Sequence, residues 1–174
     1  MGKYKLRLYN KDSPKLYKRE ETKLKKILPK NTNIEHIGSS AVVGLRGKGL
    51  IDIIIAVPKR KISKIKIILE KGEYEFRPNS GDKERLFFRR DYTSNGKTRR
   101  VHLHLTHYPS KTWLGTRAVR DYLRTHKEEA REYEEVKRKA VKKAKGNGET
   151  YRKVKNKYLK LLTKKALKSL KLKL

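Results

Sequence analysis

The sequence predicts an α+β fold, with a mixed β-sheet of about four or five strands flanked by helices and a helical C-terminal part. Three observations lead to this prediction. The Ile-rich run at 50–57 is apolar enough for a central strand that is buried on at least one face. An Asn-Gly pair at 95–96 lies between two strand-like runs and indicates a β-hairpin. From residue 112 onward, apolar residues recur at helical rather than strand spacing.

The first helix is expected between Asp12 and Pro29. Asp12 or Ser13 can cap its N-terminus, Pro14 suits the first helical position, and Pro29 ends it. The apolar residues that recur at helical spacing within it are Tyr17, Leu24, Ile27 and Leu28.

Two strands and a second helix follow. A short strand is expected at 34–37, then a loop of small residues at 38–41, and then the central strand at 50–57, which Pro58 stops. The segment 59–71 carries one apolar stripe at helical spacing, so we expect a helix there that ends at Gly72.

The hairpin has predicted arms at 85–92 and 99–107, around a turn at 94–97. Its second arm alternates in character, and this places alternate side chains on opposite faces of the sheet. One face receives Val101, Leu103 and Leu105, and the other receives His102, His104 and Thr106.

The remainder predicts three helices, at about 112–124, 127–145 and 149–170. We expect residues 1–110 to form the α+β core. Residues 111–174 are expected to form a basic helical segment that packs on this core, so that the chain makes one compact unit.

The composition points to a phosphate-rich partner. The 174 residues hold 49 Lys and Arg against 18 Asp and Glu, a net charge of +31. Residues 137–174 hold 16 of these basic residues and one acidic residue, Glu149. Such a surface attracts RNA, DNA, nucleotides and anionic lipid alike, and composition does not choose among them.

Composition also excludes several classes of protein. With no Cys, the chain can form no disulfide, thiolate zinc site or cysteine nucleophile. The longest apolar run, 53–57, is far shorter than the roughly 18 residues of a membrane span, so a cytoplasmic location is expected. The absence of Gln beside abundant Lys and Glu favours a thermophilic source or, equally, an AT-rich genome.

One group of residues has the character of a phosphate- and metal-binding site. The strand at 34–37 ends in Gly38, Ser39 and Ser40, whose small size lets backbone amides and hydroxyls approach a phosphate. Asp52 lies on the next strand, where a carboxylate can hold a divalent metal that bridges the phosphates. This Gly-Ser and Asp pattern is the nucleotidyltransferase signature of the DNA polymerase β superfamily.

A wider resemblance accompanies this pattern. Four blocks, in the correct order, resemble the GrpB-like family of predicted nucleotidyltransferases: EHIGSSAVVGLRGKGLIDIIIAV at 35–57, RRVHLHL at 99–105, VRDYLRTHKEEAREYEEVKRKAV at 119–141 and YRKVKNKYLKLL at 151–162. The resemblance runs from about Tyr9 to Ala166. It implies a nucleotidyltransferase-like sheet, a nucleoside triphosphate (NTP) as substrate and a divalent metal as cofactor.

The metal-binding strand departs from the superfamily pattern. Where active relatives carry a second carboxylate two residues after the first, this chain has Ile54. His102 and His104 stand where the third carboxylate is expected. One Asp with two His suits Mn²⁺ or another transition metal better than a pair of Mg²⁺ ions. Asp52, His102 and His104 are therefore the predicted metal ligands, with Mn²⁺ or Mg²⁺ as the expected ion.

Several neighbours of this site have both a functional and a structural interpretation. Glu35 is a weaker candidate for a further metal ligand, as is His36, which is better explained as a structural residue. Lys48, just before the metal strand, is predicted to contact phosphate, although a solvated lysine is an equal alternative. Arg117 and Arg120 share a helical face with Arg124 and are predicted to bind phosphate or another anionic substrate group.

The leading hypothesis is an enzyme that transfers a nucleotidyl group from an NTP to an unidentified acceptor hydroxyl, with Asp52 and His104 as the catalytic residues. The alternative is a nucleotidyltransferase scaffold with altered chemistry that binds RNA, DNA or another polyanion. A weaker alternative is a metal-dependent phosphoesterase that uses the same site.

Overall fold

A computed structural model describes residues 5–94 and 96–170 of the chain. Asn95, in the predicted hairpin turn, lies outside the described residues. The outermost residues of the two predicted parts, 1–4 and 171–174, lie outside them as well. The division into a core at 1–110 and a helical segment at 111–174 stays a prediction.

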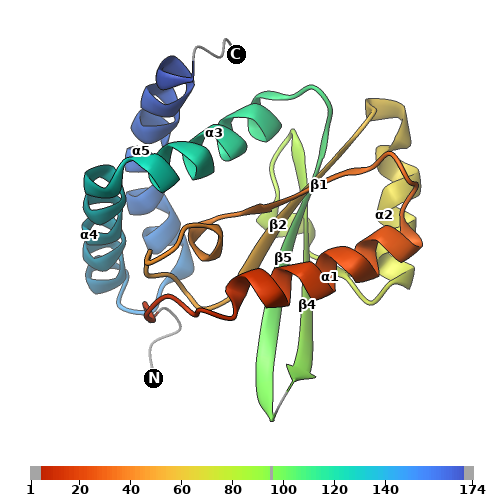
Figure 1. Ribbon diagram of the computed structural model, residues 1–174, viewed down its shortest axis with the longest axis horizontal. Helices are drawn as coiled ribbons and strands as arrows, with labels where there is room; N and C mark the ends of the chain where they lie inside the picture. Colours follow the sequence, from red (N-terminus) through yellow and green to blue (C-terminus); the bar gives the residue numbers. More distant parts are fainter. Residues whose placement is uncertain (1–4, 95, 171–174) are drawn as a thin grey trace.

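A five-stranded mixed sheet lies at the centre of the structure (Figure 1). Its order is β1 (Asn33–Ile37), β2 (Ile51–Val57), β5 (Lys97–His107), β4 (Arg85–Ser94) and β3 (Glu75–Phe76). Only β2 and β5 run parallel to each other, and the other neighbours are antiparallel. The predicted α+β class with a mixed sheet is confirmed, and the hairpin of β4 and β5 is longer than expected.

Five helices accompany the sheet: α1 (Ser13–Ile27), α2 (Ile62–Lys71), α3 (Lys111–Thr125), α4 (Lys127–Ala144) and α5 (Gly148–Ser169). Each agrees with a predicted helix to within a few residues. Residues 59–61, which were expected in the second helix, instead form a 3₁₀ turn after Pro58, so that α2 begins at Ile62.

The two faces of the sheet are covered differently. On one face, the side chains of Ile51, Ile53 and Ile55 pack with apolar residues of α1 and α2 in the main core. Figure 1 shows α1 crossing this side of the sheet. On the other face, Ile54 packs against Trp113 of α3. Because side chains alternate along a strand, Asp52 lies on the same face as Ile54, towards the C-terminal helices.

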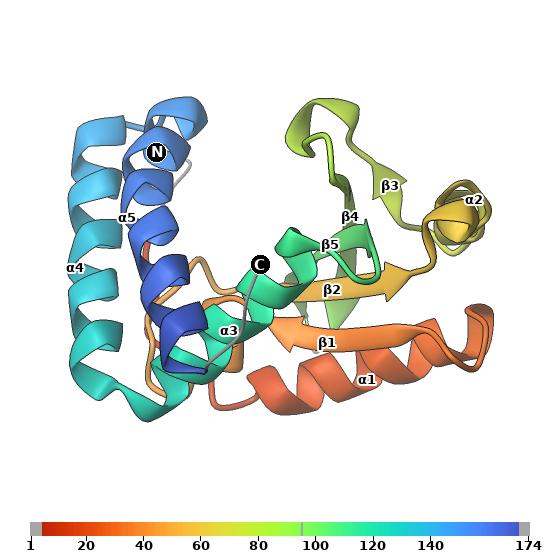
Figure 2. The same cartoon turned by 90° about the horizontal axis from the view of Figure 1, so that it is seen from above.

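The C-terminal helices form a second core with the loop between β1 and β2. Val42 and Leu45 of this loop pack among residues of α3, α4 and α5. Figure 2 shows α4 and α5 side by side, with α3 connecting them to the sheet. The loop that follows the Gly-Ser motif is thus built into both parts of the molecule.

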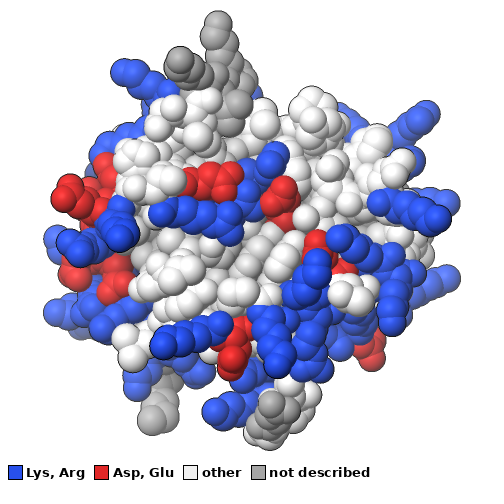
Figure 3. All heavy atoms as spheres, in the orientation of Figure 1, with Lys and Arg blue, Asp and Glu red and all other residues white. Residues whose placement is uncertain are grey.

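Charge is spread over the surface. On the face drawn in Figure 3, Lys and Arg side chains surround a central zone of uncharged residues. Among the described residues, no helix has the length and apolar character needed to cross a bilayer.

A buried polar cluster joins α1 to the sheet. Tyr74, which is fully buried, donates a hydrogen bond to Glu20 Oε1 at 2.5 Å. Arg90 of β4 donates to both Glu20 oxygens, at 3.1 and 3.4 Å. Burial and the Glu20 carboxylate both raise the pKa of Tyr74, so its hydroxyl remains a donor. The cluster satisfies a carboxylate that would otherwise be costly to bury.

We expect Tyr74→Phe to lower the free energy of unfolding by about 1–2 kcal/mol, because Glu20 loses one of its buried donors. Chemical denaturation measures this change. Tyr108→Phe is the matched control, because Tyr108 is 53% exposed. Equal effects of the two substitutions would show that the buried hydrogen bond contributes nothing.

Candidate functional site

The backbone of Gly38 lies directly beside the Asp52 carboxylate. Strand β1 ends at Ile37, which is paired with Asp52, and Gly38 follows with a φ of +71°. A Cβ at this position would lie 2.5 Å from Asp52 Oδ2. Both the positive φ and the close approach therefore require glycine.

The two serines after Gly38 have different surroundings. Ser39 lies against Gly47, where a Cβ would overlap its hydroxyl. Ser40 is buried, and its hydroxyl is 3.0 Å from His36 Nε2. The structure therefore places Gly38 beside Asp52 and Ser39 against Gly47, whereas the Ser40 hydroxyl is engaged in a buried pair.

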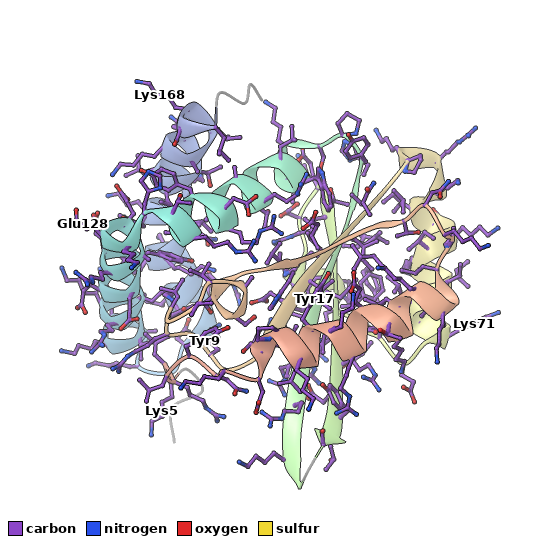
Figure 4. All side chains as sticks on the ribbon, in the orientation of Figure 1. Lys5, Tyr9, Tyr17, Lys71, Glu128 and Lys168 are labelled. Carbon is purple, nitrogen blue, oxygen red and sulfur yellow. The ribbon has the colours of Figure 1, made fainter. Side chains whose placement is uncertain are left out.

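His36 has structural contacts. Its ring stacks on Tyr17 with 4.5 Å between centroids, and Figure 4 shows Tyr17 between α1 and the sheet. Burial lowers the pKa of His36 to about 4, so the ring is neutral at pH 7. These contacts fit the structural alternative that the sequence left open.

Asp52, His102 and His104 converge on the face of the sheet opposite α1. Asp52 Oδ1 is 3.4 Å from His102 Nδ1 and 3.8 Å from His104 Nε2. The ring of Phe87, from β4, lies edge-on to both imidazoles at centroid distances of 5.0 and 5.2 Å. The alternation of β5 and its parallel pairing with β2 bring these three side chains together.

The electrostatics of this cluster favour an ionised Asp52. Burial opposes ionisation, but the side chains of His102 and His104 outweigh it and hold the pKa of Asp52 below its usual range. Burial lowers the pKa of His104, against the opposing effect of Asp52. A carboxylate beside a neutral imidazole can orient that imidazole and stabilise it when it takes up a proton.

The donors do not fit a pair of Mg²⁺ ions. Ile54, at the position of the second carboxylate, is fully buried against Trp113. As the side chains stand, the described residues contain no group of three or more His, Cys, Asp or Glu that could hold a metal ion. The role of Asp52, His102 and His104 as metal ligands stays a prediction.

Three lysines from separate segments interact electrostatically with Asp52. Lys48 comes from the loop before β2, Lys137 from α4 and Lys155 from α5. Burial is the main cause that lowers the pKa of each, to about 8 for Lys48 and for Lys137, while the Asp52 carboxylate opposes it. At Lys137 the Glu134 carboxylate opposes burial more strongly than Asp52 does, so two carboxylates act on these three partly desolvated ammonium groups.

Tyr151 supports two of these lysines. The ammonium of Lys48 lies 4.4 Å from the centroid of this buried ring, and that of Lys155 lies 6.0 Å from it. Cation–π attraction of this kind holds charged groups in place without neutralising them. The arrangement therefore links the loop before β2 to α5.

Side chains of the C-terminal helices hold the backbone of the loop that follows Ser39. Arg124 donates to the carbonyl of Ala41 at 3.0 Å. Glu134 accepts from the amide of Arg46 at 3.1 Å, and Lys137 donates to the carbonyl of Arg46. The position of the loop relative to Asp52 is thus fixed by α3 and α4.

The structure gives Arg120 and Arg117 carboxylate partners. Arg120 is buried, and it donates to Glu35 at 2.6 Å, to the carbonyl of His36 at 3.0 Å and to both oxygens of Asp121. Arg117 Nε is 3.3 Å from Glu35 Oε1. The predicted phosphate-binding role of the two arginines stays untested, and these contacts describe a clamp between α3 and β1.

Comparison with known proteins identifies the family of this chain. The chain matches the GrpB protein family over residues 3–165. This chain belongs to the GrpB family.

Two curated relatives are the UPF0157 protein PA4798 of Pseudomonas aeruginosa and the UPF0157 protein YqkA of Bacillus subtilis. The first is 32% identical over 119 residues, which cover 68% of this chain and 48% of the relative. The second is 27% identical over 138 residues, which cover 78% of this chain and 39% of the relative. This chain therefore spans less than half the length of these relatives.

Solved structures extend the comparison to the fold. The conserved protein GrpB from Enterococcus faecalis has a TM-score of 0.79 at 26% identity, and the match covers 95% of this chain and 99% of that one. A Cid1 structure, described as an RNA terminal uridylyl transferase, has a TM-score of 0.53 at 13% identity over 79% of this chain and 42% of that one. These likenesses establish a nucleotidyltransferase-like fold.

Sequence reasoning missed Lys137 and Lys155, which interact electrostatically with Asp52, and Tyr151, whose ring lies beside Lys48 and Lys155. Their contacts depend on how α4 and α5 pack against the loop, and periodicity does not reveal that packing. Lys137 is only 3% exposed, although it lies in a segment of α4 whose other charged residues are exposed or half-buried. In a chain this basic, no local signal separates such a lysine from its solvated neighbours.

We expect Gly38→Ala to displace the Asp52 carboxylate and to weaken nucleotide binding by at least tenfold, measured by isothermal titration. Gly44→Ala is a closely matched control, because Gly44 also has a positive φ, +82°, but has nothing within 4 Å of an added Cβ. Both variants should lose about 1 kcal/mol of stability from the backbone strain. Only Gly38→Ala should lose binding, and equal binding by the two would contradict the close-approach argument.

Proposed function

We propose that this protein is a nucleotidyltransferase. In this proposal it binds an NTP between the Gly38-Ser39 turn and the lysines of α4 and α5, and transfers the nucleotidyl group to an acceptor hydroxyl. The observation that carries the proposal is a set of three partly desolvated lysines, Lys48, Lys137 and Lys155, that interact electrostatically with Asp52. A triphosphate is a ligand of matching charge for such a site.

The fold adds support. The Cid1 poly(U) polymerase bound to MgATP is similar to this chain with a TM-score of 0.50 at 12% identity, over 76% of this chain and 45% of that one. Likeness at this level concerns the fold, so the substrate, the reaction and the metal belong to the proposal. Asp52, His102 and His104 are the donors that would hold a single divalent ion, Mn²⁺ or Mg²⁺.

The residues near Asp52 suit one arrangement of the reaction. The acceptor oxygen attacks the α-phosphorus, and the bond from that phosphorus to the bridging oxygen of pyrophosphate breaks. His104, whose pKa is lowered by burial, takes the acceptor proton as a neutral imidazole, and Asp52 stabilises the imidazolium that forms. Lys48 and Lys155 balance the charge of the departing pyrophosphate.

One alternative has its own supporting observation. Ile54 is fully buried where relatives carry a carboxylate, which favours a scaffold that binds nucleotide or nucleic acid but no longer transfers a nucleotidyl group. The two candidates differ in one readout: both bind a triphosphate, and only the transferase releases pyrophosphate. Cleavage of simple phosphoesters with intact NTP would instead support the phosphoesterase alternative.

We expect Lys155→Ala to weaken binding of a non-hydrolysable ATP analogue by at least tenfold in isothermal titration, because a desolvated cation beside the triphosphate is lost. Lys139→Ala, at an exposed position of α4, should bind within twofold of the wild type.

Asp52→Asn should reduce transfer from α-labelled NTP by at least a hundredfold and abolish any gain in affinity from Mn²⁺. Unchanged binding in Lys155→Ala, or unchanged transfer in Asp52→Asn, would overturn the site assignment.

The affinity for ATP should fall as the pH rises from 7 to 9. Burial lowers the pKa of Lys48 to about 8, so this lysine is charged below pH 8 and loses its proton, and its attraction for phosphate, above it. Lys137, whose pKa burial also lowers to about 8, adds to the effect. Lys48→Arg keeps a charge across this range, so its affinity should fall less steeply. An affinity independent of pH in the wild type would exclude these lysines as phosphate ligands.

A further inference from the structure

Helix α5 carries a continuous row of exposed lysines on one side. We call it the α5 lysine stripe, and it consists of Lys153, Lys157, Lys160, Lys164 and Lys168. Successive members are three or four residues apart, the spacing that places side chains above one another on one helical face. Figure 4 shows Lys168, at the end of the stripe, pointing away from the rest of the molecule.

The stripe has the dimensions of a strand-binding surface. From Lys153 to Lys168 the helix rises about 22 Å, fifteen steps of 1.5 Å each. A nucleic-acid strand in a duplex presents a phosphate about every 3.4 Å along its axis, so several phosphates fall within this length. Evenly spaced cations suit a regularly repeating polyanion better than a single anionic group.

The charge of the stripe is uncompensated. Among the described residues, none of its five lysines takes part in an ion pair with Asp or Glu, and Glu149 is the one acidic residue of α5. The neighbouring Lys165, which lies off this face, does pair with Glu129 of α4 at 2.8 Å. Like charges on successive turns repel one another, so an isolated stripe costs stability that a polyanion would restore.

The opposite side of α5 is already occupied. Its apolar residues Tyr151, Leu162 and Ala166 are buried in the two helical cores. A helix that lies on a membrane needs a continuous apolar face to insert, and on α5 that face packs inside the protein, with Leu161, 56% exposed, as an isolated apolar side chain beside the stripe. A nucleic-acid backbone therefore fits the stripe better than a lipid surface.

The stripe and the candidate site share a helix. Lys155, near Asp52, lies between the first two lysines of the stripe in sequence, and the stripe continues from there towards the C-terminal end of α5. Figure 2 shows α5 running along the outer part of the molecule beside α4. Lys155 is two residues from Lys153 and from Lys157, so it lies on the opposite face of α5, and a strand held on the stripe would run along the outer side of the helix whose inner side contributes to the site.

We propose that the α5 lysine stripe binds the phosphodiester backbone of a nucleic acid, independently of its sequence. Binding of nucleic acid by the stripe does not depend on the proposed function. Only the further step, in which the bound strand serves as the acceptor of the nucleotidyl group, rests on the proposed function.

The test is fluorescence anisotropy with a labelled 20-nucleotide single-stranded RNA, titrated at several salt concentrations. The variant Lys157→Ala, Lys160→Ala, Lys164→Ala should bind at least tenfold more weakly at moderate salt. Its plot of log affinity against log salt should be shallower by about 2, since each lost phosphate contact contributes about 0.7 for a single strand.

The matched control removes the same charge elsewhere. Lys61, Lys64 and Lys71 are exposed lysines of α2 and the residue before it, and they form no ion pair among the described residues. Their triple alanine variant should bind within twofold of the wild type, with an unchanged salt slope. Equal losses of RNA affinity in the two triple variants would show that binding depends on net charge alone, and this would overturn the proposal.

Three further measurements decide the partner and its relation to the site. DNA of the same sequence should bind within a few-fold of the RNA, because the backbone is the shared feature. Equally tight, stripe-dependent binding of polyglutamate or of phosphatidylserine vesicles would overturn the assignment to nucleic acid. Asp52→Asn should bind RNA like the wild type, so failure of the stripe and failure of the nucleotide site are distinguishable.

Discussion

The contact between the Gly38 backbone and the Asp52 carboxylate is the constraint on which the rest of the site depends. It exists because the antiparallel register of β1 and β2 pairs Ile37 with Asp52, and because a residue without a side chain follows. With the carboxylate placed there, the parallel register of β2 and β5 adds His102 and His104. The helices α3 and α4 then hold the loop after Ser39 through its backbone, so a shift of the helical part would move the turn against Asp52.

Much of the fold follows from short-range patterns. The helices could be predicted from apolar spacing and from Pro and Gly at their ends, and the hairpin from Asn-Gly between alternating runs. The sheet order could not, since the parallel pairing of β2 with β5 joins segments about fifty residues apart and is decided by tertiary packing. The two-residue strand β3 likewise exists only through its pairing with β4.

The candidate site, like the fold, could be predicted only in part. Strand alternation predicted that His102 and His104 share a face, and an Asp in an apolar strand marked Asp52 as unusual. The partners of Arg120 could not be foreseen, because Glu35 and His36 lie on an edge strand that α3 reaches only in the folded chain. The contribution of α4 and α5 was hidden because net charge is high everywhere, and only burial distinguishes the lysines that face Asp52.

The most direct test of the central claim, that phosphate binds between the Gly38-Ser39 turn and α5, is a crystal structure with a non-hydrolysable NTP analogue and Mn²⁺. The account predicts triphosphate oxygens within hydrogen-bonding distance of Ser39 and of the ammonium groups of Lys48 and Lys155. Nucleotide bound elsewhere on the protein, for example in the cavity of about 760 Å³ that Tyr9, Val43 and Arg131 help to line on the face of the loop towards α1, would contradict it.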